Sequence, residues 1–576
     1  MPMRIPPQVI DIFCWVSHAA GLITRLSLGS FVFGTALLLA VAVYRLFLHP
    51  LSRIPGPRLA AVTNCWLAYH VRNGRMLQLG KTLHTNYGPA VRVGPNEVWF
   101  NTKDAFRLIY SPTNGYEKSS FYLATELLKP KLDTRLGIQS PDTLDLLAER
   151  DMKRYRLQRR LIGPIYHTNN VKRYEAAVDA VLLRVVDQLR ALGGAEVDLK
   201  EWMHIITVEC LGAVSLSWSP GYLAEKSDGA SGKHAYMGWR RKSVFGLFPL
   251  AVIIEPLSRH FGRAFSVLWG VTYHTPKEGF RPFFPVSTLI PRTKFRIYPS
   301  PADTADKAVQ KKINSRVRAV LRGKSRGDNR RDITADLIQL HQDRPDEFKL
   351  PYLRRMAITN FGAGHETMTS TLISTFAMLG AHPEVQQRVA REVVATSETR
   401  SRLGSPAYDD AVRLQLTQTS IREAQRLHPV IGMALPRRVP GGGMAVHGLA
   451  IPPGTTVGCN PVSLHRSPEI FGDDAEVFRP ERWLVGGGDG NDDEEKTRAM
   501  ERYNLIWGGG ARTCPGRHLA EMLVSKIAPA LVANFEVEVT MPPEEEIPYY
   551  FMAMLTGVRA RFMPRKVASE EREVVE

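Results

Sequence analysis

Three patterns of apolar and polar residues follow one another along this chain. From Leu26 to Tyr44 the run LSLGSFVFGTALLLAVAVY has no charged residue over 19 positions. A helix of that length spans about 28 Å, close to the hydrocarbon core of a bilayer. Further on, most apolar stretches have the period of an amphipathic helix, whereas VRVGPNEVWF, from Val91 to Phe100, alternates like a short sheet. The pattern predicts a mainly α-helical protein with a minor β part, preceded by a single transmembrane helix.

The apolar run at residues 26–44 has one rival interpretation, a cleaved signal peptide. A signal peptide has a shorter apolar run that ends at small residues, and no such cleavage site precedes Arg45. A membrane anchor is therefore expected. More arginines follow the run than precede it, so the positive-inside rule places the large C-terminal part in the cytosol. These arginines are Arg45, Arg53 and Arg58 after the run, and Arg4 and Arg25 before it.

Proline and glycine clusters divide the rest of the chain. HPLSRIPGP, from His49 to Pro57, holds three prolines and a glycine, so it cannot continue the helix and is expected to form a stiff connector. GGGDGNDDEE, from Gly486 to Glu495, is expected to be an exposed loop insertion. The expected order is an N-terminal segment (1–25), an anchor (26–44), a proline-rich hinge (45–60), one large domain (61–565) and a charged tail (566–576).

Charge and cysteine content exclude several classes of protein. The formal net charge is +18, but Lys and Arg are interleaved with Asp and Glu along the whole sequence, so no nucleic-acid partner is expected. An acidic protein partner and an anionic membrane surface fit this charge equally well. The five cysteines are scattered, which argues against a disulfide scaffold, structural zinc and iron–sulfur clusters. A cysteine that binds a metal here needs a cofactor to supply the other ligands.

Cys514 is the cysteine with the most informative surroundings, the segment WGGGARTCPGRHLAEMLV. Glycines 508–510 precede it and Pro515 opens an apolar-periodic run, so Cys514 is expected at a helix N-terminus. There, backbone N–H groups stabilise a thiolate, the glycines admit a flat ligand, and Arg512 can pair with an anionic group of that ligand. By these arguments alone, a buried structural cysteine at a glycine turn is as good an interpretation as a metal ligand.

This segment closely resembles the heme-binding signature F-x-x-G-x-R-x-C-x-G of the cytochrome P450 superfamily, matched by Gly510, Arg512, Cys514 and Gly516. Trp507 stands where the family usually has Phe. An indole can still stack near the sulfur, so this departure bears on the redox tuning of the iron rather than on its ligation. The resemblance implies the cytochrome P450 fold, heme b (iron protoporphyrin IX) as cofactor, and Cys514 as the ligand of its iron.

Residues 352–382 contain no proline and are expected to form one long helix. The middle is unusual, because Gly362 and Gly364 weaken the helix just before Glu366 and Thr367. A distorted turn is expected there, which would open a groove for oxygen and water. On this segment alone, a threonine bonded back to the preceding turn and a solvated glutamate are the better interpretation.

The same positions resemble the oxygen-activation motif A/G-G-x-D/E-T of the family, matched by Ala363, Gly364, Glu366 and Thr367. They lie upstream of the cysteine, as the family order requires. The resemblance makes Thr367 and Glu366 the catalytic residues: Thr367 supplies a hydrogen bond during oxygen activation, and Glu366 relays protons. His365, between them, is expected to be a bystander.

Glu423 and Arg426, in SIREAQRLHP, stand at positions i and i+3 on one helix face, and Pro429 ends that helix. An exposed ion pair of this kind contributes only about 0 to 1 kcal/mol. Together with Arg482 in FRPERW, however, the pair resembles the family's E-x-x-R and P-E-R network. The resemblance makes Glu423, Arg426 and Arg482 a buried structural network that holds the cysteine loop.

Two further arginines are expected to contact the heme propionates. Arg159, in YRLQRR, corresponds to the arginine of the family's W/H-x-x-x-R helix, with Tyr155 in the aromatic position. Arg437, in LPRRVP, follows the E-x-x-R helix as a heme-contacting arginine does in the family, and Arg438 is the alternative. A solvated surface arginine is the competing interpretation at both sites.

The resemblance extends from the proline-rich hinge to about Arg565, so residues 61–565 are expected to be a heme-thiolate catalytic domain. It implies a monooxygenase that inserts one atom of O2 into a small apolar substrate, with electrons from NADPH through a separate NADPH-cytochrome P450 reductase. HPLSRIPGP, VRVGPNEV and IPPGTTVG look most like filamentous-fungal enzymes of secondary metabolism. The expected location is the endoplasmic reticulum membrane, crossed once, with the catalytic domain facing the cytosol.

Two other functions stay open from the sequence. An isomerase or dehydratase of the same fold rearranges an oxygenated substrate without a reductase, and a non-catalytic heme-binding membrane protein senses or stores a ligand. Neither needs protons relayed to dioxygen, so the presence of both Glu366 and Thr367 favours the monooxygenase.

Overall fold

The structure, a computed structural model, describes residues 7–126, 131–133, 137–139, 142–249, 311–318, 331–397, 403–484 and 491–565. The expected charged tail, residues 566–576, lies outside them. Helices predominate and the sheets are small, which confirms the predicted fold class.

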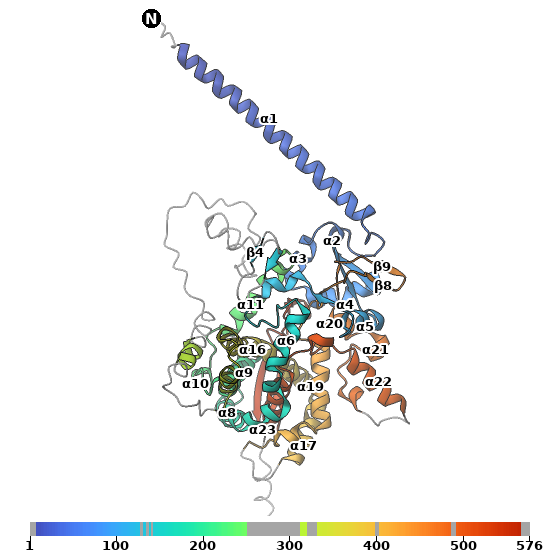
Figure 1. Ribbon diagram of the computed structural model, residues 1–576. Helices are drawn as coiled ribbons and strands as arrows, with labels where there is room; N and C mark the ends of the chain where they lie inside the picture. Colours follow the sequence, from blue (N-terminus) through green and yellow to red (C-terminus); the bar gives the residue numbers. More distant parts are fainter. Residues whose placement is uncertain are drawn as a thin grey trace, which may run out of the picture.

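The long helix α16 runs through the centre of the helical part (Figure 1). It spans Leu350–Ala381 and so confirms the helix predicted for residues 352–382. The other helices that position the site are α5 (Lys103–Tyr110), α6 (Met152–Ile162), α9 (Leu199–Leu216), α11 (Ser231–Gly246), α19 (Gln415–Leu427) and α23 (Arg517–Asn534). Around them lie α2 (Arg58–Val62), α3 (Cys65–Arg72), α4 (Met76–Tyr87), α7 (Thr168–Val171), α8 (Glu175–Arg190), α10 (Tyr222–Glu225), α15 (Ile333–Asp343), α17 (Pro383–Thr396), α18 (Tyr408–Ala411), α20 (Pro461–Leu464), α21 (Pro468–Phe471) and α22 (Asn491–Arg502).

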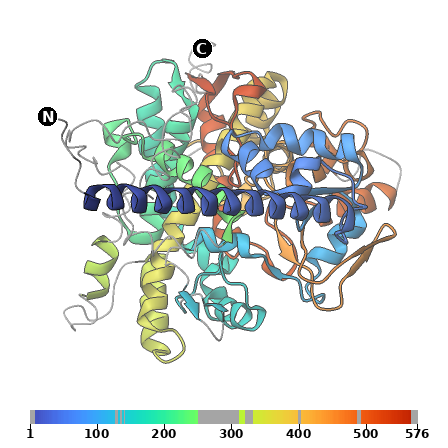
Figure 2. The same cartoon turned by 90° about the horizontal axis from the view of Figure 1, so that it is seen from above.

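The largest described sheet joins segments that are far apart in the sequence. Strands β1 (Ala90–Gly94) and β2 (Glu97–Phe100) form the hairpin that the alternating pattern predicted. The full order is β1-β2-β10-β7-β3, with β10 at Thr456–Cys459, β7 at Arg437–Arg438 and β3 at Glu117–Lys118. Figure 2 shows these N-terminal (blue) and C-terminal (orange) segments side by side. The smaller sheets are β11 (Phe535–Thr540), β12 (Arg559–Pro564) and β6 (Val197–Asp198); β4 (Lys131–Asp133) with β5 (Gly137–Gln139); and β8 (Met444–Val446) with β9 (Leu449–Ile451).

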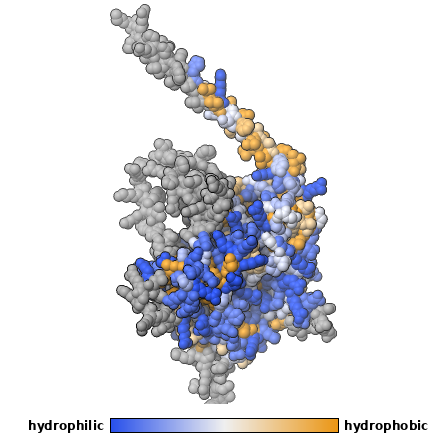
Figure 3. All heavy atoms as spheres, viewed as in Figure 1, coloured by the Kyte–Doolittle hydropathy of each residue, from blue (hydrophilic) through white to orange (hydrophobic). Residues whose placement is uncertain are grey.

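The N-terminal helix α1 extends away from the rest of the molecule (Figure 1). It spans Pro7–Val43 and continues as a π-helix over Tyr44–Leu48. Residues 24–48 are long and apolar enough to cross a membrane and are not buried, and Figure 3 shows hydrophobic residues along this part. The expected anchor at residues 26–44 lies inside this helix. The helix begins well before residue 26, because no helix-breaking cluster separates residues 7–25 from the apolar run.

The proline-rich connector packs onto the large domain. Leu51 and Ile54 are 0% and 6% exposed and belong to the core. Arg92 donates a hydrogen bond of 2.8 Å to the carbonyl of Arg45, and Arg45 donates one of 2.6 Å to the carbonyl of Val62. The end of the anchor is therefore held against the domain by side chains that bond to backbone.

Two local expectations are wrong. The loop insertion expected at residues 486–495 is in part helical, because α22 begins at Asn491 and its Glu494 pairs with Arg498 at helical spacing. Residues 486–490 lie outside the described part. The distorted turn expected in α16 is also absent, since this helix is α-helical from end to end. Gly364 has a packing reason instead: a Cβ there would lie 2.9 Å from Cδ1 of Leu211 on α9.

Candidate active site

Cys514 lies in the turn that leads into α23. The helix begins at Arg517, two residues later than the sequence predicted, with Gly516 as its N-cap. The amide of Cys514 donates a hydrogen bond of 2.8 Å to the carbonyl of Trp507, which closes the loop. Burial raises the pKa of the Cys514 thiol, and the N–H of Gly516 and the charge of Arg159 offset this only in part. The surrounding chain therefore favours the thiol, and a bound metal cation would convert it to the thiolate.

The glycines before Cys514 are required by the packing of this loop. A Cβ on Gly509 would lie 2.7 Å from Cβ of Tyr110, and one on Gly510 would lie 1.9 Å from the carbonyl oxygen of Tyr110. Gly510 also has a φ of +63°, in the left-handed region that favours glycine. The close approach to the end of α5 thus explains these two glycines, whereas the sequence suggested only a flat ligand. A Cβ on Gly516 would have no atom within 4 Å, so packing does not explain that glycine.

Two of the predicted arginines hold the cysteine loop against α6 and the residues before it. Arg159 donates a hydrogen bond of 2.8 Å to the carbonyl of Thr513. Arg512 donates to two backbone carbonyls, one of them that of Arg150 at 2.7 Å. Its guanidinium carbon lies 4.1 Å from the ring centre of Tyr155. Both arginines therefore tie the loop of Cys514 to the segment around α6.

Lys118 and Arg437 form a buried pair of cations. They are direct partners in the antiparallel ladder of β3 and β7, and they are 8% and 3% exposed. Lys118 donates to the carbonyl of Leu147 at 2.6 Å, and Arg437 to the hydroxyl of Tyr122 at 3.5 Å. Burial, with the charges of Arg437 and Arg512, lowers the pKa of Lys118 well below its ordinary value. Like charges directly opposite in a ladder repel each other, so this cluster suits an anion.

Glu366 and Thr367 on α16 have different surroundings. Glu366 is 8% exposed, and its Oε2 accepts a hydrogen bond of 2.6 Å from the indole of Trp239. Its Oε1 has no hydrogen-bond partner among the described residues. Burial raises the pKa of Glu366, and the charge of Lys242 offsets part of that rise. Thr367 donates to the carbonyl of Ala363 at 2.9 Å, so the threonine is bonded back to the preceding turn but the glutamate is not solvated.

Tyr166 links α16 with the cysteine loop. Its hydroxyl donates a hydrogen bond to the side chain of Asn360 on α16. Burial raises the pKa of Tyr166, and a negative charge on Cys514 raises it further. Tyr166 thus bonds directly to α16 and lies within electrostatic range of Cys514.

Glu423, Arg426 and Arg482 are brought together in the interior. Glu423 and Arg426 are fully buried, and the carboxylate accepts two hydrogen bonds of 2.8 Å from Arg426 and one of 2.7 Å from Arg482. Arg426 also donates to the carbonyl of His465 at 2.6 Å, and the ring of His465 accepts from the amide of Leu505 at 2.8 Å. This chain of bonds reaches the segment that precedes the cysteine loop. Burial alone would raise the pKa of Glu423, but the two guanidiniums lower it below its ordinary value.

The family model described as Cytochrome P450 matches residues 57–559. The chain belongs to the cytochrome P450 family. Cytochrome P450 monooxygenase sdnT of Sordaria araneosa is 57% identical over 539 residues, which cover 92% of this chain and 93% of that protein. Cytochrome P450 monooxygenase gsfF of Penicillium aethiopicum is 27% identical and covers 91% and 95%. A pisatin demethylase of Fusarium vanettenii is 26% identical and covers 86% and 87%. The protein is thus a cytochrome P450 monooxygenase.

The described residues of this cytochrome P450 fit a heme iron. Among them, no group of three or more His, Cys, Asp or Glu is placed to hold a metal ion. Lys118, Arg437 and Arg512 repel one another, so they suit the carboxylates of heme. Arg512 belongs to the same glycine-rich loop as Cys514, two residues before it. When bound, the heme iron supplies the activation of dioxygen.

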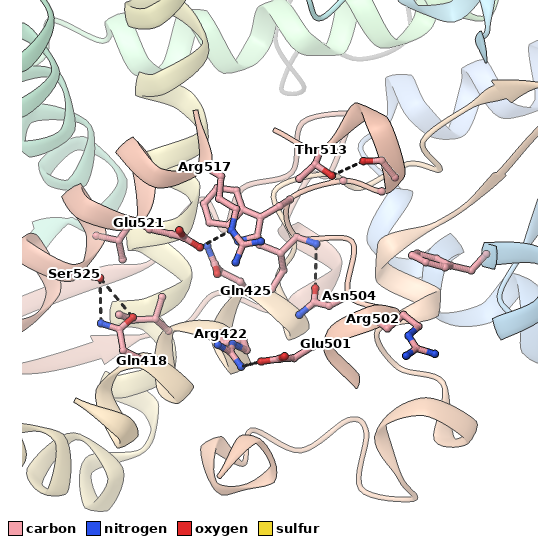
Figure 4. Close-up of a pocket in the computed structure, with 18 residues that line it drawn as sticks. Gln418, Arg422, Gln425, Glu501, Arg502, Asn504, Thr513, Arg517, Glu521 and Ser525 are labelled. Atoms are coloured by element: carbon pink, nitrogen blue, oxygen red, sulfur yellow. Dashed lines mark hydrogen bonds and ion pairs between the residues drawn. The ribbon is translucent and has the colours of Figure 1, made fainter. Parts of the chain in front are cut away.

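A hollow of about 490 Å³ lies beside the cysteine loop of the cytochrome P450 (Figure 4). Its walls come from the loop itself and from α19, α22 and α23, and no described residue of α16 lines it. Arg422 pairs with Glu501 at 2.6 Å and Arg517 with Glu521 at 2.7 Å, and Arg502 also lines the hollow. The indole of Trp507 also lines the hollow, 5.8 Å from the guanidinium of Arg517. This hollow is therefore an outer face of the loop, distinct from the α16 side.

Three residues of the site were not found from the sequence. Lys118 lies in a two-residue strand, too short for any pattern, and Trp239 and Tyr166 contact α16 from elements remote in the sequence. Of the two candidate arginines after α19, Arg437 is buried in the cation cluster and Arg438 is exposed. The exposed neighbour was equally plausible from sequence because the two are adjacent and identical.

Proposed function

We propose that this cytochrome P450 inserts one atom of O2 into a small apolar molecule of fungal secondary metabolism. The observation that carries the proposal is the buried carboxyl of Glu366, with one oxygen free of described partners, directly before Thr367. A rearranging isomerase or dehydratase has no need for a buried proton carrier at this place. The names of the relatives from Sordaria and Penicillium, both monooxygenases, support the same reading.

Each predicted residue has a proposed task. Cys514 ligates the iron of heme b, and Trp507, Gly510 and Gly516 shape the loop around it. Arg437, Arg159, Arg512 and Lys118 bind the heme propionates. Arg159 also holds the loop through its bond to the carbonyl of Thr513. Thr367 accepts or donates a hydrogen bond where oxygen is activated, and Glu366 takes up and releases the protons; burial raises the pKa of Glu366, which makes the carboxyl a better proton carrier than an exposed one. Glu423, Arg426 and Arg482 keep the loop in place.

Electrons are proposed to come from NADPH through a separate NADPH-cytochrome P450 reductase. The hollow of Figure 4 suits such a partner. Its arginines can pair with acidic side chains of the partner, and the backbone next to Cys514 forms part of its wall. Helix α1 is proposed to cross the endoplasmic reticulum membrane once, with the catalytic domain on the cytosolic side.

The experiment supplies the full-length protein in membranes with reductase, NADPH and candidate apolar precursors. Oxygenated product is expected only when both reductase and NADPH are present, with one labelled oxygen atom from 18O2 in each product. Cys514→Ser is expected to lose the thiolate-type band of the ferrous–CO complex, because a serine oxygen is a harder donor than sulfur. Product formed by the parent without reductase would overturn the proposal, and an unchanged CO band in the variant would remove Cys514 as the ligand.

A further inference from the structure

Three titratable side chains, two of them buried and His365 half-buried, form a line beside α16. Nδ1 of His204 lies 2.7 Å from Oδ2 of Asp228, and Nε2 of His204 lies 3.3 Å from Nδ1 of His365. The side chains of His204 and Asp228 are 4% and 5% exposed. Helices α9 and α16, which carry the two histidines, lie side by side in Figure 1, and Gly364 packs against Leu211 there. His365, expected to be a bystander, is the inner end of this line.

The short contacts along the line indicate where its protons lie: Nδ1 of His204 is at ion-pair distance from Oδ2 of Asp228, without the alignment of a hydrogen bond. Burial alone would raise the pKa of Asp228, but His204 and the amide of Gly232 lower it, so Asp228 is a carboxylate. A carboxylate only accepts, which places a proton on Nδ1 of His204. The lone pair on Nε2 of neutral His204 then accepts the Nδ1–H of His365. Neutral His365 is left with a lone pair on its own Nε2.

The position of Asp228, 2.7 Å from Nδ1 of His204, favours a positive charge at that end of the line over the His365 end. Burial, with the charges of His204 and Lys242, lowers the pKa of His365 to about 3. When Nε2 of His365 takes up a proton, its Nδ1 proton can shift to Nε2 of His204, where the positive charge lies beside the carboxylate of Asp228. One proton enters at Nε2 of His365 and one shifts between the rings. The reverse transfers release one proton from the same atom, so uptake and release involve equal numbers of protons.

We propose that Asp228, His204 and His365 form a proton store that supplies the oxygen chemistry at α16. The inference rests on the proposed monooxygenase function, which consumes protons next to this store. Glu366 follows His365 in the chain, and a positive charge on His204 lowers the pKa of Glu366. Loading the store therefore makes Glu366 the stronger proton donor.

The surroundings of the store are tightly built and carry other charges. A Cβ on Gly232 would lie 2.8 Å from Oδ2 of Asp228 and 3.0 Å from Nδ1 of His204, so only glycine leaves room for their contact. Among the described residues, the other titratable or charged groups around the line are Lys200 and Glu201 of α9, Tyr222 of α10, Lys233 and Lys242 of α11, and Glu366 of α16; Glu201 accepts from the amide of Asp228 at 3.2 Å. The lysines oppose a second positive charge, which limits the store to one proton.

The first test observes the histidine rings themselves, in the full-length holoprotein with 15N-labelled histidine in lipid nanodiscs. His204→Gln and His365→Gln identify the two sets of signals. As the pH falls, both rings of the parent are expected to change together, with His204 becoming doubly protonated, and Asp228→Asn is expected to abolish this joint change. Independent titration of the two rings, or a joint change that survives in Asp228→Asn, would overturn the store. This readout needs no turnover and holds whatever the reaction is.

The second test measures product formed per NADPH across the pH range with reductase present. In the parent this ratio is expected to fall as the pH rises, because the store empties. In His365→Gln it should be low and independent of pH, with product reduced up to about 100-fold at the acid end, the lower range for a positioned proton donor. NADPH consumption and the CO band should persist, which separates a lost proton supply from a folding defect.

The matched control is His341→Gln on α15. This histidine bonds to the carbonyl of Phe348 at 2.7 Å, within its own segment, and its replacement should leave the pH profile unchanged. A parent-like profile in His365→Gln would overturn the store while leaving the monooxygenase intact. Absence of NADPH-dependent product in the parent would instead overturn the proposed function. The titrations of the two histidine rings would then be the test of the proton store.

Discussion

Lys118 and Arg437 lie directly opposite each other in the ladder of β3 and β7, and both are buried. Two cations in this arrangement repel each other; the carboxylates of Asp145 and Glu149 offset this in part, and a bound anion would offset it further. In a cytochrome P450, the heme carboxylates are anions of the required charge. We therefore expect the pair to couple the stability of the five-stranded sheet to the presence of the cofactor.

Lys118→Met is expected to weaken heme binding. A hydrogen bond to a charged group contributes about 1.5 to 3 kcal/mol, so heme should dissociate about 10- to 100-fold faster, as followed by the loss of the heme absorbance. Arg438→Met is the control, because that arginine is the exposed neighbour of Arg437. Equal heme loss in the two variants would contradict the role of the buried pair.

Glu423→Gln should destabilise the protein much more than Glu481→Gln. Glu423 is fully buried between two guanidiniums, and breaking such a pair costs about 3 to 5 kcal/mol. Glu481 pairs with Arg388 at 2.5 Å, but the two side chains are 34% and 44% exposed. Loss of this ion pair should therefore cost only about 0 to 1 kcal/mol. Denaturant unfolding of both variants measures the difference, and similar losses would show that the buried network is not structural.

The same carboxylate predicts an acid limit. The pKa of Glu423 is lower in the folded chain than in the unfolded chain, so its contribution to stability is complete above about pH 4.3, its unfolded value. The contribution is lost as the pH falls through the folded pKa. Unfolding measured from pH 6 to 3 should therefore show a steeper decline for the parent than for Glu423→Gln.

Thr367→Ala should separate NADPH consumption from product formation. The hydroxyl is not needed for electron delivery, so heme, the CO band and NADPH consumption should persist. Product should fall about 10- to 1000-fold, the range for a lost catalytic hydrogen bond or proton relay, and hydrogen peroxide should rise. Thr375→Ala is the control, because Thr375 on the same helix is also bonded back, at 2.8 Å to the carbonyl of Thr371. Full coupling in Thr367→Ala would exclude Thr367 from oxygen activation.

Deletion of residues 1–44 should release much of the protein from membranes and leave its stability unchanged. The cut keeps Arg45, whose side chain bonds to Val62 and whose carbonyl accepts from Arg92. Deletion of residues 1–45 removes both bonds and should lower the stability of the domain by about 1 to 3 kcal/mol. Sedimentation with membranes and thermal unfolding measure the two effects. Release of the intact protein by a carbonate wash would contradict the anchor.

Sequence alone determined the features that depend on neighbouring residues. Prolines bounded the long helix that is α16, alternation marked the β1–β2 hairpin, and the signature around Cys514 indicated the family. These features could be predicted because helix breaking, strand pleating and a cofactor-binding loop each require specific residues within a few positions of one another. The pairing of Glu423 with Arg426 in the E-x-x-R motif could be predicted for the same reason.

Tertiary structure alone decided which remote side chains meet. The partnership of Lys118 with Arg437 arises from a ladder between segments on opposite sides of the chain's midpoint, and the line from His365 to Asp228 requires α9 and α16 to touch at Gly364. No local pattern encodes such contacts, because they depend on how whole helices and strands pack to bury their apolar faces. The unbroken course of α16 was decided in the same way: packing against α9 at Gly364 maintains a helix that its glycines, taken alone, would weaken.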